Sequence, residues 1–174
     1  MQTELYSYDQ LSASPFGRLW TAVGPNGLVA VGWESEEQAF RHKLSTLLIS
    51  ASRSFEILRD ASRTRQASQE LSEYFAKQRR EFEIAIDWEV LPGFQRQALQ
   101  ATFAIPYGQV RSYGEIARQI GHPGAARAVG RAEATNPMPL VLPCHRVVGS
   151  DGKLHGYAGP GGLEMKRWLL KLEA

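Results

Sequence analysis

Residues 136–149 read Asn136-Pro-Met-Pro-Leu-Val-Leu-Pro-Cys-His-Arg-Val-Val-Gly149 and contain the only cysteine of the chain, Cys144. An apolar run over residues 140–142 carries the backbone inward, and Pro143 then fixes one backbone dihedral. The polar residues that follow must find partners or meet a cavity, because a buried polar group without a partner is costly. We therefore expect the thiol of Cys144 at the floor of a pocket, with the rest of the chain organised around it.

The pair Cys144-His145 indicates a reactive thiol. A cysteine attacks as the thiolate, so its ordinary pKa near 8.5 must fall, or a base must take the proton at neutral pH. His145 is a candidate base. Adjacent side chains of a strand point to opposite faces, so the pair needs a turn or a bridging water to interact. For the cysteine considered alone, the alternative is an inert, buried core residue.

Length and composition favour a globular protein of one large or two small domains, with 174 residues and 43% hydrophobic content. One cysteine excludes an intramolecular disulfide, and the four histidines lack the close spacing of a zinc site. We expect no metal and no cofactor. The sequence has no basic segment followed by an apolar signal core, and no apolar run long enough to span a membrane. These features predict a cytoplasmic protein with no membrane partner.

Charge is distributed unevenly along the chain, although the net charge is only +2. Residues 1–87 hold ten Lys/Arg against twelve Asp/Glu, whereas residues 88–174 hold ten against six. Between positions 96 and 146 two glutamates face six arginines, at positions 96, 111, 118, 127, 131 and 146. This is a modest electrostatic footprint for a polyanion.

The first half of the chain predicts a small sheet covered by helices. Alternating apolar residues predict strands over 5–8, 18–23 and 28–33, and helical spacing predicts a helix that starts at Ser35-Glu-Glu37 and runs to Ser50. A polar link over residues 53–65 leads to a helix expected near 67–78, and residues 82–86 alternate like a further strand. We place the domain boundary after residue 90, which gives domains 1–90 and 91–174.

The second half predicts short helices. A helix is expected over 94–104, and Ser112-Tyr-Gly-Glu115 matches the capping box that opens another. That helix stops at Gly121, and a second short helix spans 125–134. Two helices joined by a tight turn, with arginines on the second, form the helix-turn-helix pattern of DNA-binding proteins. The same corner also occurs as simple helix packing.

The second of these helices combines small residues with arginines. Its face carries almost no side-chain bulk around a projecting Arg127, so another surface can approach its backbone closely; the residues concerned are Ala125, Ala126, Ala128 and Gly130. The alternative is that this face packs against a neighbouring helix.

Three motifs together resemble the family of O6-alkylguanine-DNA alkyltransferases, also called methylated-DNA–protein-cysteine methyltransferases. They are Pro143-Cys-His-Arg-Val147, the helix-turn-helix before it, and Gly156-Tyr-Ala-Gly159 after it. Further stretches extend the resemblance over nearly the whole chain, namely residues 14–20, 105–108, 111–114 and 166–170.

The resemblance implies an α+β protein with two domains. The N-terminal α/β domain would have a small sheet and a ribonuclease-H-like topology, and the mostly helical C-terminal domain would bind DNA and accept the alkyl group. The implied activity is a direct, single-turnover transfer of an alkyl group, typically methyl, to Cys144 from O6-alkylguanine and O4-alkylthymine in double-stranded DNA. A self-inactivating monomer without a cofactor is implied.

The resemblance also implies roles for individual residues. Cys144 would be the acceptor, His145 a base acting through water, Glu173 the carboxylate that orients His145, and Asn136 the brace of the turn. Tyr113 would donate to the guanine ring. The backbone at Val147 and Ala158 would read the guanine edge, and Tyr157 and Lys166 would line or support the pocket. Arg127 would fill the stack left by the flipped nucleotide, on a DNA-facing helix that also presents Ala125, Ala126, Gly130 and Arg131.

Two features depart from the family pattern. Members of the family commonly have Gly-Gly-Leu directly after the Gly156-Tyr-Ala-Gly159 motif, whereas here Pro160 precedes Gly161-Gly-Leu163, and this one extra residue affects the expected loop shape. Glu133 places a carboxylate on the expected DNA-facing helix, where it would weaken DNA binding.

Three other functional classes are open to this sequence. A non-repairing alkyltransferase-like protein would recognise damaged DNA only, but such proteins typically carry tryptophan in place of the cysteine. A cysteine hydrolase would use Cys144, His145 and Glu173, but no recognisable hydrolase motif supplies a distant histidine. A transcription regulator would use the helix-turn-helix, but no dimerisation or effector element is recognisable.

Overall fold

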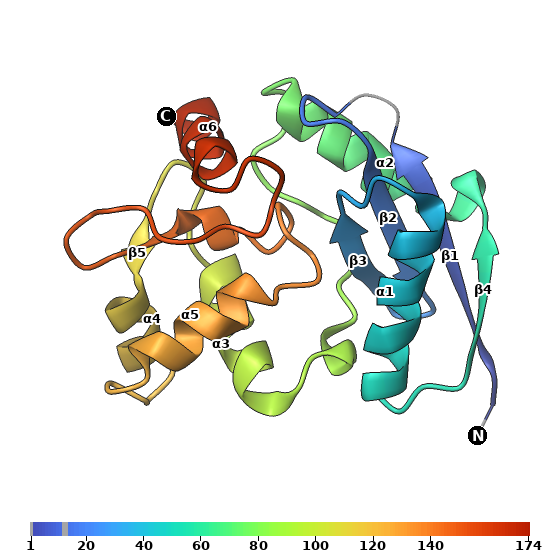
Figure 1. The fold of residues 1–174 in the computed structure, drawn as a ribbon, viewed down its shortest axis with the longest axis horizontal. Helices are drawn as coiled ribbons and strands as arrows, with labels where there is room; N and C mark the ends of the chain where they lie inside the picture. The colour runs from blue at the N-terminus through green and yellow to red at the C-terminus, as the bar shows by residue number, and fades with distance from the viewer. Residues whose placement is uncertain (1, 12–13) are drawn as a thin grey trace. The chain divides into compact units, whose positions relative to one another are not determined.

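The computed structural model of the protein describes residues 2–11 and 14–174 (Figure 1). The described residues form two compact units, which divide between Leu91 and Pro92. The mixed α+β class predicted from the sequence is confirmed by the order of helices and strands. In the described part of the chain, no helix combines the length and the apolarity that crossing a membrane requires.

The N-terminal unit is built on a four-stranded sheet of order β3-β2-β1-β4. Strand β1 pairs antiparallel with β2 and parallel with β4, and β2 pairs antiparallel with β3. The strands span Glu4–Leu11 (β1), Leu19–Gly24 (β2), Gly27–Gly32 (β3) and Phe55–Arg59 (β4). The three strands predicted for residues 5–33 are therefore confirmed, and β2 and β3 form the predicted hairpin.

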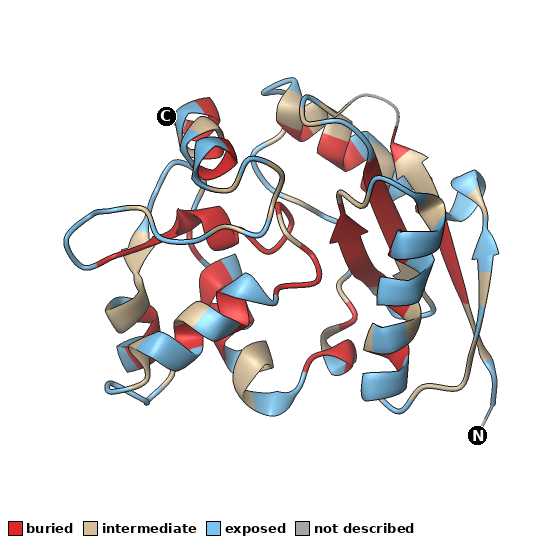
Figure 2. Cartoon of the chain, viewed as in Figure 1, coloured by how far each residue is buried: buried red, intermediate tan, exposed pale blue. Residues whose placement is uncertain are grey.

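Two helices pack on this sheet, and its central strands are buried along both faces (Figure 2). Helix α1 (Glu37–Ser50) matches the predicted helix, and its Phe40 ring stacks on Trp20 of β2 with ring centroids 5.8 Å apart. Helix α2 (Ala61–Phe75) packs along β1 and β2. Residues buried consecutively, rather than alternately, mark a strand covered on both faces.

Two predictions for this unit were wrong. The polar link over 53–65 contains the edge strand β4. Its side chains are mostly exposed, so the sequence lacks the apolar alternation that predicts a strand. Helix α2 begins at Ala61 rather than near residue 67. Residues 82–86 form no strand beyond one bridge between Leu28 and Ile86. The buried carboxylate of Glu70 instead accepts the backbone N–H groups of Glu83 and Ile84, at 2.9 and 3.2 Å.

The C-terminal unit is mostly helical, as predicted. Its elements are α3 (Gly93–Phe103), β5 (Arg111–Ser112), α4 (Tyr113–Gln119), α5 (Ala126–Ala134), a 3-10 helix η2 (Cys144–Arg146), β6 (Val147–Val148) and α6 (Leu163–Glu173). A further 3-10 helix, η1 (Trp88–Val90), precedes this unit. The core between α3, α4 and α5 consists of small and branched apolar side chains, including Ala98, Ile116, Val129 and Val147.

Helices α4 and α5 form the predicted helix-turn-helix. The capping box is present, because Ser112 accepts the backbone N–H of Glu115 while the Glu115 carboxylate accepts the backbone N–H of Ser112. Gly121 ends the first helix with a φ of 78°, a left-handed conformation that favours glycine. Strand β5 pairs in parallel with β6, so the residue that caps α4 lies beside the chain that follows Cys144.

Candidate active site

The loop that carries Cys144 is buried over residues 136–149, apart from a half-buried Pro139 (Figure 2). Asn136 braces it from both sides: its amide donates to the carbonyl of Leu142 at 2.8 Å, and its side-chain oxygen accepts the backbone N–H of Met138 at 2.9 Å. Leu140 has a φ of 76°, which is uncommon outside glycine. These bonds hold the loop in a conformation that its residues would not adopt alone.

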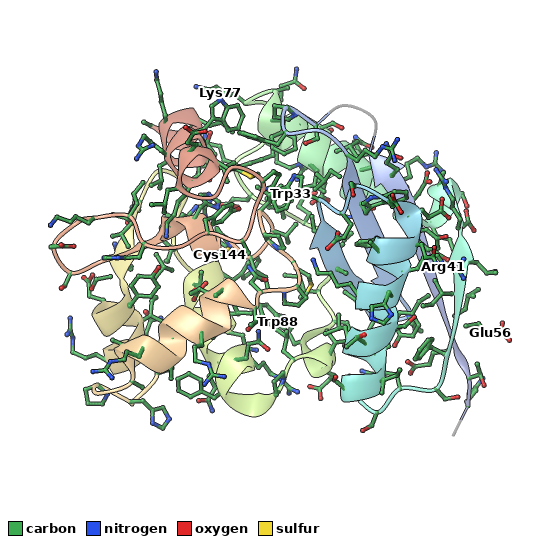
Figure 3. The ribbon with its side chains drawn as sticks, viewed as in Figure 1. Trp33, Arg41, Glu56, Lys77, Trp88 and Cys144 are labelled. Atoms are coloured by element: carbon green, nitrogen blue, oxygen red, sulfur yellow. The ribbon has the colours of Figure 1, made fainter. Side chains whose placement is uncertain are left out.

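Cys144 opens the 3-10 helix η2 and is only 6% exposed (Figure 3). Burial, together with the smaller effect of Glu133, raises the pKa of its thiol to about 12, although the Asn136 side chain and Lys166 act in the opposite direction. The thiol is therefore protonated at neutral pH. Of the two routes to a thiolate expected from the sequence, a pre-lowered pKa and a nearby base, the geometry favours the base.

His145 lies within the same 3-10 turn and is fully buried. Its Nε2 is 2.7 Å from Oε1 of Glu173, the last residue of α6. Burial lowers the pKa of His145, and Glu173 opposes this shift. When the neutral ring donates through Nε2 to Glu173, Nδ1 is the nitrogen that can accept a proton. The structure thus brings together the histidine and carboxylate that the sequence places 28 residues apart.

Arg146 is a functional residue that the sequence reasoning missed. It was counted in the electrostatic footprint for DNA, but it is only 6% exposed. Its Nε donates to Glu173 Oε2 at 2.9 Å, its Nη2 to Oε1 at 3.0 Å, and its Nη1 to the carbonyl of Ile105 at 2.6 Å. The backbone N–H of Gly108 also donates to Glu173 Oε2, at 3.2 Å. Glu173 is therefore held as a carboxylate by four donors, including His145. The signal available in the sequence was the position of Arg146 inside the Cys144 motif.

Lys166 of α6 connects the other predicted pocket residues. It is 1% exposed, and its amine donates to the carbonyls of Val147 at 2.7 Å and His155 at 3.0 Å, with the Tyr113 hydroxyl 3.5 Å away. Burial lowers the pKa of Lys166, while Cys144 and Glu133 raise it. The Val147 carbonyl has a second lone pair, so it can accept one further hydrogen bond.

Tyr113, at the start of α4, is half-buried. Burial, with smaller contributions from Glu133 and Cys144, raises the pKa of its hydroxyl to about 12. It is therefore a neutral hydrogen-bond donor at physiological pH. Tyr157 and Ala158 lie on the loop that leads to α6, and the next residue, Gly159, sits so close to Met165 and Tyr157 that a side chain there would meet both at 2.6 Å.

Helix α5 presents one side to solvent, where Arg127, Ala128 and Arg131 are exposed. Ala125, Ala126 and Gly130 are half-buried, and the backbone of Gly130 lies against the Tyr113 ring. Arg127 therefore projects from the exposed side of α5, whereas three of the four small residues are half-buried and Ala125 packs against the core of the unit.

The expectation for Glu133 was wrong. Its side chain lies on the inner side of α5, 6% exposed, and Oε1 accepts a hydrogen bond from the Thr102 hydroxyl at 2.6 Å. Burial raises the pKa of Glu133 to about 8, so it is mainly uncharged at neutral pH and does not face DNA. Helical periodicity explains the difference, because Glu133 is four residues from Val129 and shares its buried face.

Family models match almost the whole chain. The model described as 6-O-methylguanine DNA methyltransferase, ribonuclease-like domain, matches residues 6–88, and the DNA binding domain of the same family matches residues 93–174. A methylated-DNA–protein-cysteine methyltransferase of Mycolicibacterium paratuberculosis is 55% identical over 109 residues. That alignment covers 62% of this chain and 63% of the relative, so the chain spans less than two thirds of its length.

Other relatives align over nearly their full length. The methylated-DNA–protein-cysteine methyltransferase of Salmonella typhimurium is 41% identical over 166 residues, 92% of each chain. The crystal structure of Mycobacterium tuberculosis OGT in complex with DNA is 38% identical and superposes with a TM-score of 0.70, covering 97% of this chain and 92% of that one. The matched domains, the identities and the common fold establish that the chain belongs to the 6-O-methylguanine DNA methyltransferase family.

Proposed function

We propose that this protein repairs double-stranded DNA by transferring an alkyl group, typically methyl, from O6-alkylguanine or O4-alkylthymine to Cys144. One observation carries the proposal: Cys144 is buried beside the His145–Glu173 pair, on a loop joined through β6 and β5 to the start of the helix-turn-helix. A nucleophile, a base and a DNA-binding motif therefore belong to one folded unit. The names of the relatives and the DNA complex of one of them support this assignment.

The proton of the Cys144 thiol leaves first. It passes through a bridging water to Nδ1 of His145, because Nε2 is engaged with Glu173. The imidazolium that forms is stabilised by the Glu173 carboxylate, which Arg146 keeps ionised and in place. Lys166 favours the thiolate electrostatically, since its cationic form interacts attractively with Cys144.

The thiolate sulfur then attacks the alkyl carbon. A carbon–sulfur bond forms as the carbon–O6 bond breaks, and the bonding electron pair moves to the guanine oxygen and ring. Tyr113 donates a hydrogen bond to the ring as this charge develops, and the proton taken up by His145 neutralises the guanine that leaves. The carbonyl of Val147 and the backbone at Ala158 contact the guanine edge. Lys166 supports this arrangement through its bonds to Val147 and its proximity to the Tyr113 hydroxyl.

The alkylated base lies inside the duplex, so it must be extruded before Cys144 can reach it. Extrusion costs a few kcal/mol, which an inserted side chain offsets by filling the gap in the base stack. Arg127 is suited to this because it projects from the exposed side of α5 between residues of little bulk. Arg131 on the same side is placed to contact phosphate.

The product is a thioether on Cys144, which water does not cleave under mild conditions. The protein therefore acts once, as a monomer, and needs no cofactor. A cytoplasmic location is part of the proposal, since a free acceptor thiol requires a reducing compartment.

Arg127→Ala is expected to slow repair of an O6-methylguanine duplex by about 10²-fold or more, with little effect on transfer from free O6-benzylguanine. Only the duplex requires a nucleotide to be extruded and its gap filled. Single-turnover rates on both substrates measure the difference. Arg167→Ala removes an exposed arginine from α6 and serves as the matched control for net charge.

An equal loss on the duplex and on the free base would contradict this role of Arg127. It would mean that the side chain supports the pocket or the fold instead.

A further inference from the structure

The side chain of Glu133 has an unusual environment for a carboxyl group. It projects from α5 into the interior, where Oε1 accepts a hydrogen bond from Thr102 Oγ1 at 2.6 Å. Its other oxygen, Oε2, is buried without a hydrogen-bond partner among the described residues. An ionised carboxylate would normally gather several donors, so this site suits the protonated acid.

The positive charges nearby do not neutralise Glu133. No ion pair to Glu133 forms within residues 2–11 and 14–174. Arg146 is bound to Glu173, and the Lys166 amine donates to the carbonyls of Val147 and His155. Lys166 still lowers the pKa of Glu133 somewhat, as the Thr102 hydroxyl does, but burial dominates and raises it to about 8.

The acidic groups around Glu133 are the ones that take part in the proposed reaction. Ionised Glu133 raises the pKa of Cys144, on η2, and of Tyr113, on α4. The cation near these acids is Lys166, on α6, and α3 contributes the polar side chain of Thr102. Glu133, Cys144, Tyr113 and Lys166 therefore interact electrostatically in one poorly solvated region of the C-terminal unit. Two negative charges in such a space oppose each other, so ionisation of one acid suppresses ionisation of the next.

We propose that Glu133 is a positioning residue that must retain its proton for Cys144 to react, so that ionisation of Glu133 switches the acceptor off. The inference deepens the proposed alkyl transfer and rests on it. Glu133 neither touches the alkyl group nor gives up its proton in the reaction. While Glu133 is protonated, it adds no negative charge beside the Cys144 sulfur, so the thiolate can form there.

The test compares the wild type with Glu133→Gln, which stays neutral at every pH and retains an oxygen to accept from Thr102. Glu164→Gln, which removes an exposed carboxylate from α6, is the matched control. Rates of Cys144 modification are measured from pH 6 to 9.5 with two probes, free O6-benzylguanine and iodomethane. Iodomethane methylates a thiolate directly and needs no guanine recognition.

The ratio of the Glu133→Gln rate to the wild-type rate is expected to be constant below about pH 7. It should rise to about tenfold at pH 9, because one pH unit above its pKa only about one carboxyl in eleven keeps its proton. Glu164→Gln should follow the wild type at every pH. A ratio that stays constant with iodomethane from pH 6 to 9.5 would overturn the inference.

The two probes separate this inference from the proposed function. If the ratio rises with iodomethane but O6-benzylguanine does not react at all, the alkyltransferase assignment fails and the role of Glu133 stands. If O6-benzylguanine reacts with a constant ratio, the assignment stands and the role of Glu133 fails.

Three further measurements apply if Glu133→Gln folds poorly. Thr102→Val removes the donor that lowers the pKa of Glu133. The loss of Cys144 reactivity that ionisation of Glu133 causes should therefore occur at higher pH in Thr102→Val than in the wild type. The same pH in both proteins would contradict the inference. The folded protein also keeps a proton on Glu133 that the unfolded chain loses above about pH 4.5. The thermal unfolding temperature should therefore fall as pH rises toward 8. A carboxyl infrared band of a protonated acid, lost near pH 8, reports the same titration directly.

Discussion

Cys144→Ser is expected to abolish alkyl transfer, with a loss of at least about 10⁴-fold in rate, while binding to alkylated duplex DNA changes little. A serine hydroxyl releases its proton far less readily than a thiol, and the base beside it, His145, has a pKa lowered by burial. The two side chains have nearly the same shape, so the buried loop around position 144 should be preserved. Transfer of labelled methyl groups measures the loss, and fluorescence anisotropy with labelled duplex measures the affinity.

Cys144→Ala is the matched control for this experiment, since it removes the nucleophile without adding a hydroxyl. Both variants should be equally inactive. Methyl transfer retained by Cys144→Ser would contradict the assignment of Cys144 as acceptor.

Glu173→Gln is expected to have the second largest effect, and to act on both rate and stability. The neutral amide cannot stabilise the imidazolium of His145, so transfer at neutral pH should slow by about 10² to 10³-fold. The variant also leaves the buried guanidinium of Arg146 without its counter-charge, which should lower the free energy of unfolding by about 3–5 kcal/mol. Single-turnover kinetics and thermal unfolding measure the two effects separately.

The pH profile distinguishes a role in proton transfer from a purely structural one. The rate of Glu173→Gln should recover in part as pH rises from 6 toward 8, before Glu133 ionises, because a growing fraction of Cys144 loses its proton without help from His145. Glu164→Gln, on the exposed side of the same helix, should leave rate and stability unchanged. Wild-type rates for Glu173→Gln across pH 6 to 9 would show that Cys144 owes its reactivity to some other group.

The predictions that succeeded rest on local signals. The Ser112–Glu115 capping box and the glycine at 121 mark the helix-turn-helix because capping depends on residues within one turn. Helix α1 is recognisable because Phe40, Leu44 and Leu48 repeat at helical spacing and are buried together. The pairing of Cys144 with His145 came from their adjacency, whereas the role of Glu173 came from the family resemblance, since 28 residues separate Glu173 from His145.

The predictions that failed depend on which side of an element faces the interior. Strand β4 is mostly exposed at a sheet edge, so its side chains carry no apolar alternation. Glu133 and Arg146 carry formal charges and were therefore assigned to the surface, yet both are buried. Each is paired with a residue distant in sequence: Glu133 with Thr102 and Arg146 with Glu173. A local sequence pattern cannot predict such pairs.

The most direct test of the central claim is the mass of the intact protein after mixing with a duplex that carries one O6-methylguanine. We expect the mass to increase by one methylene group per protein, located by peptide mapping on Cys144, with the number of methyl groups removed from DNA levelling off at about one per protein. An unmodified duplex should leave the mass unchanged. An unaltered mass after the methylated base has been restored, or repair that continues well beyond one methyl group per protein, would contradict irreversible transfer to Cys144.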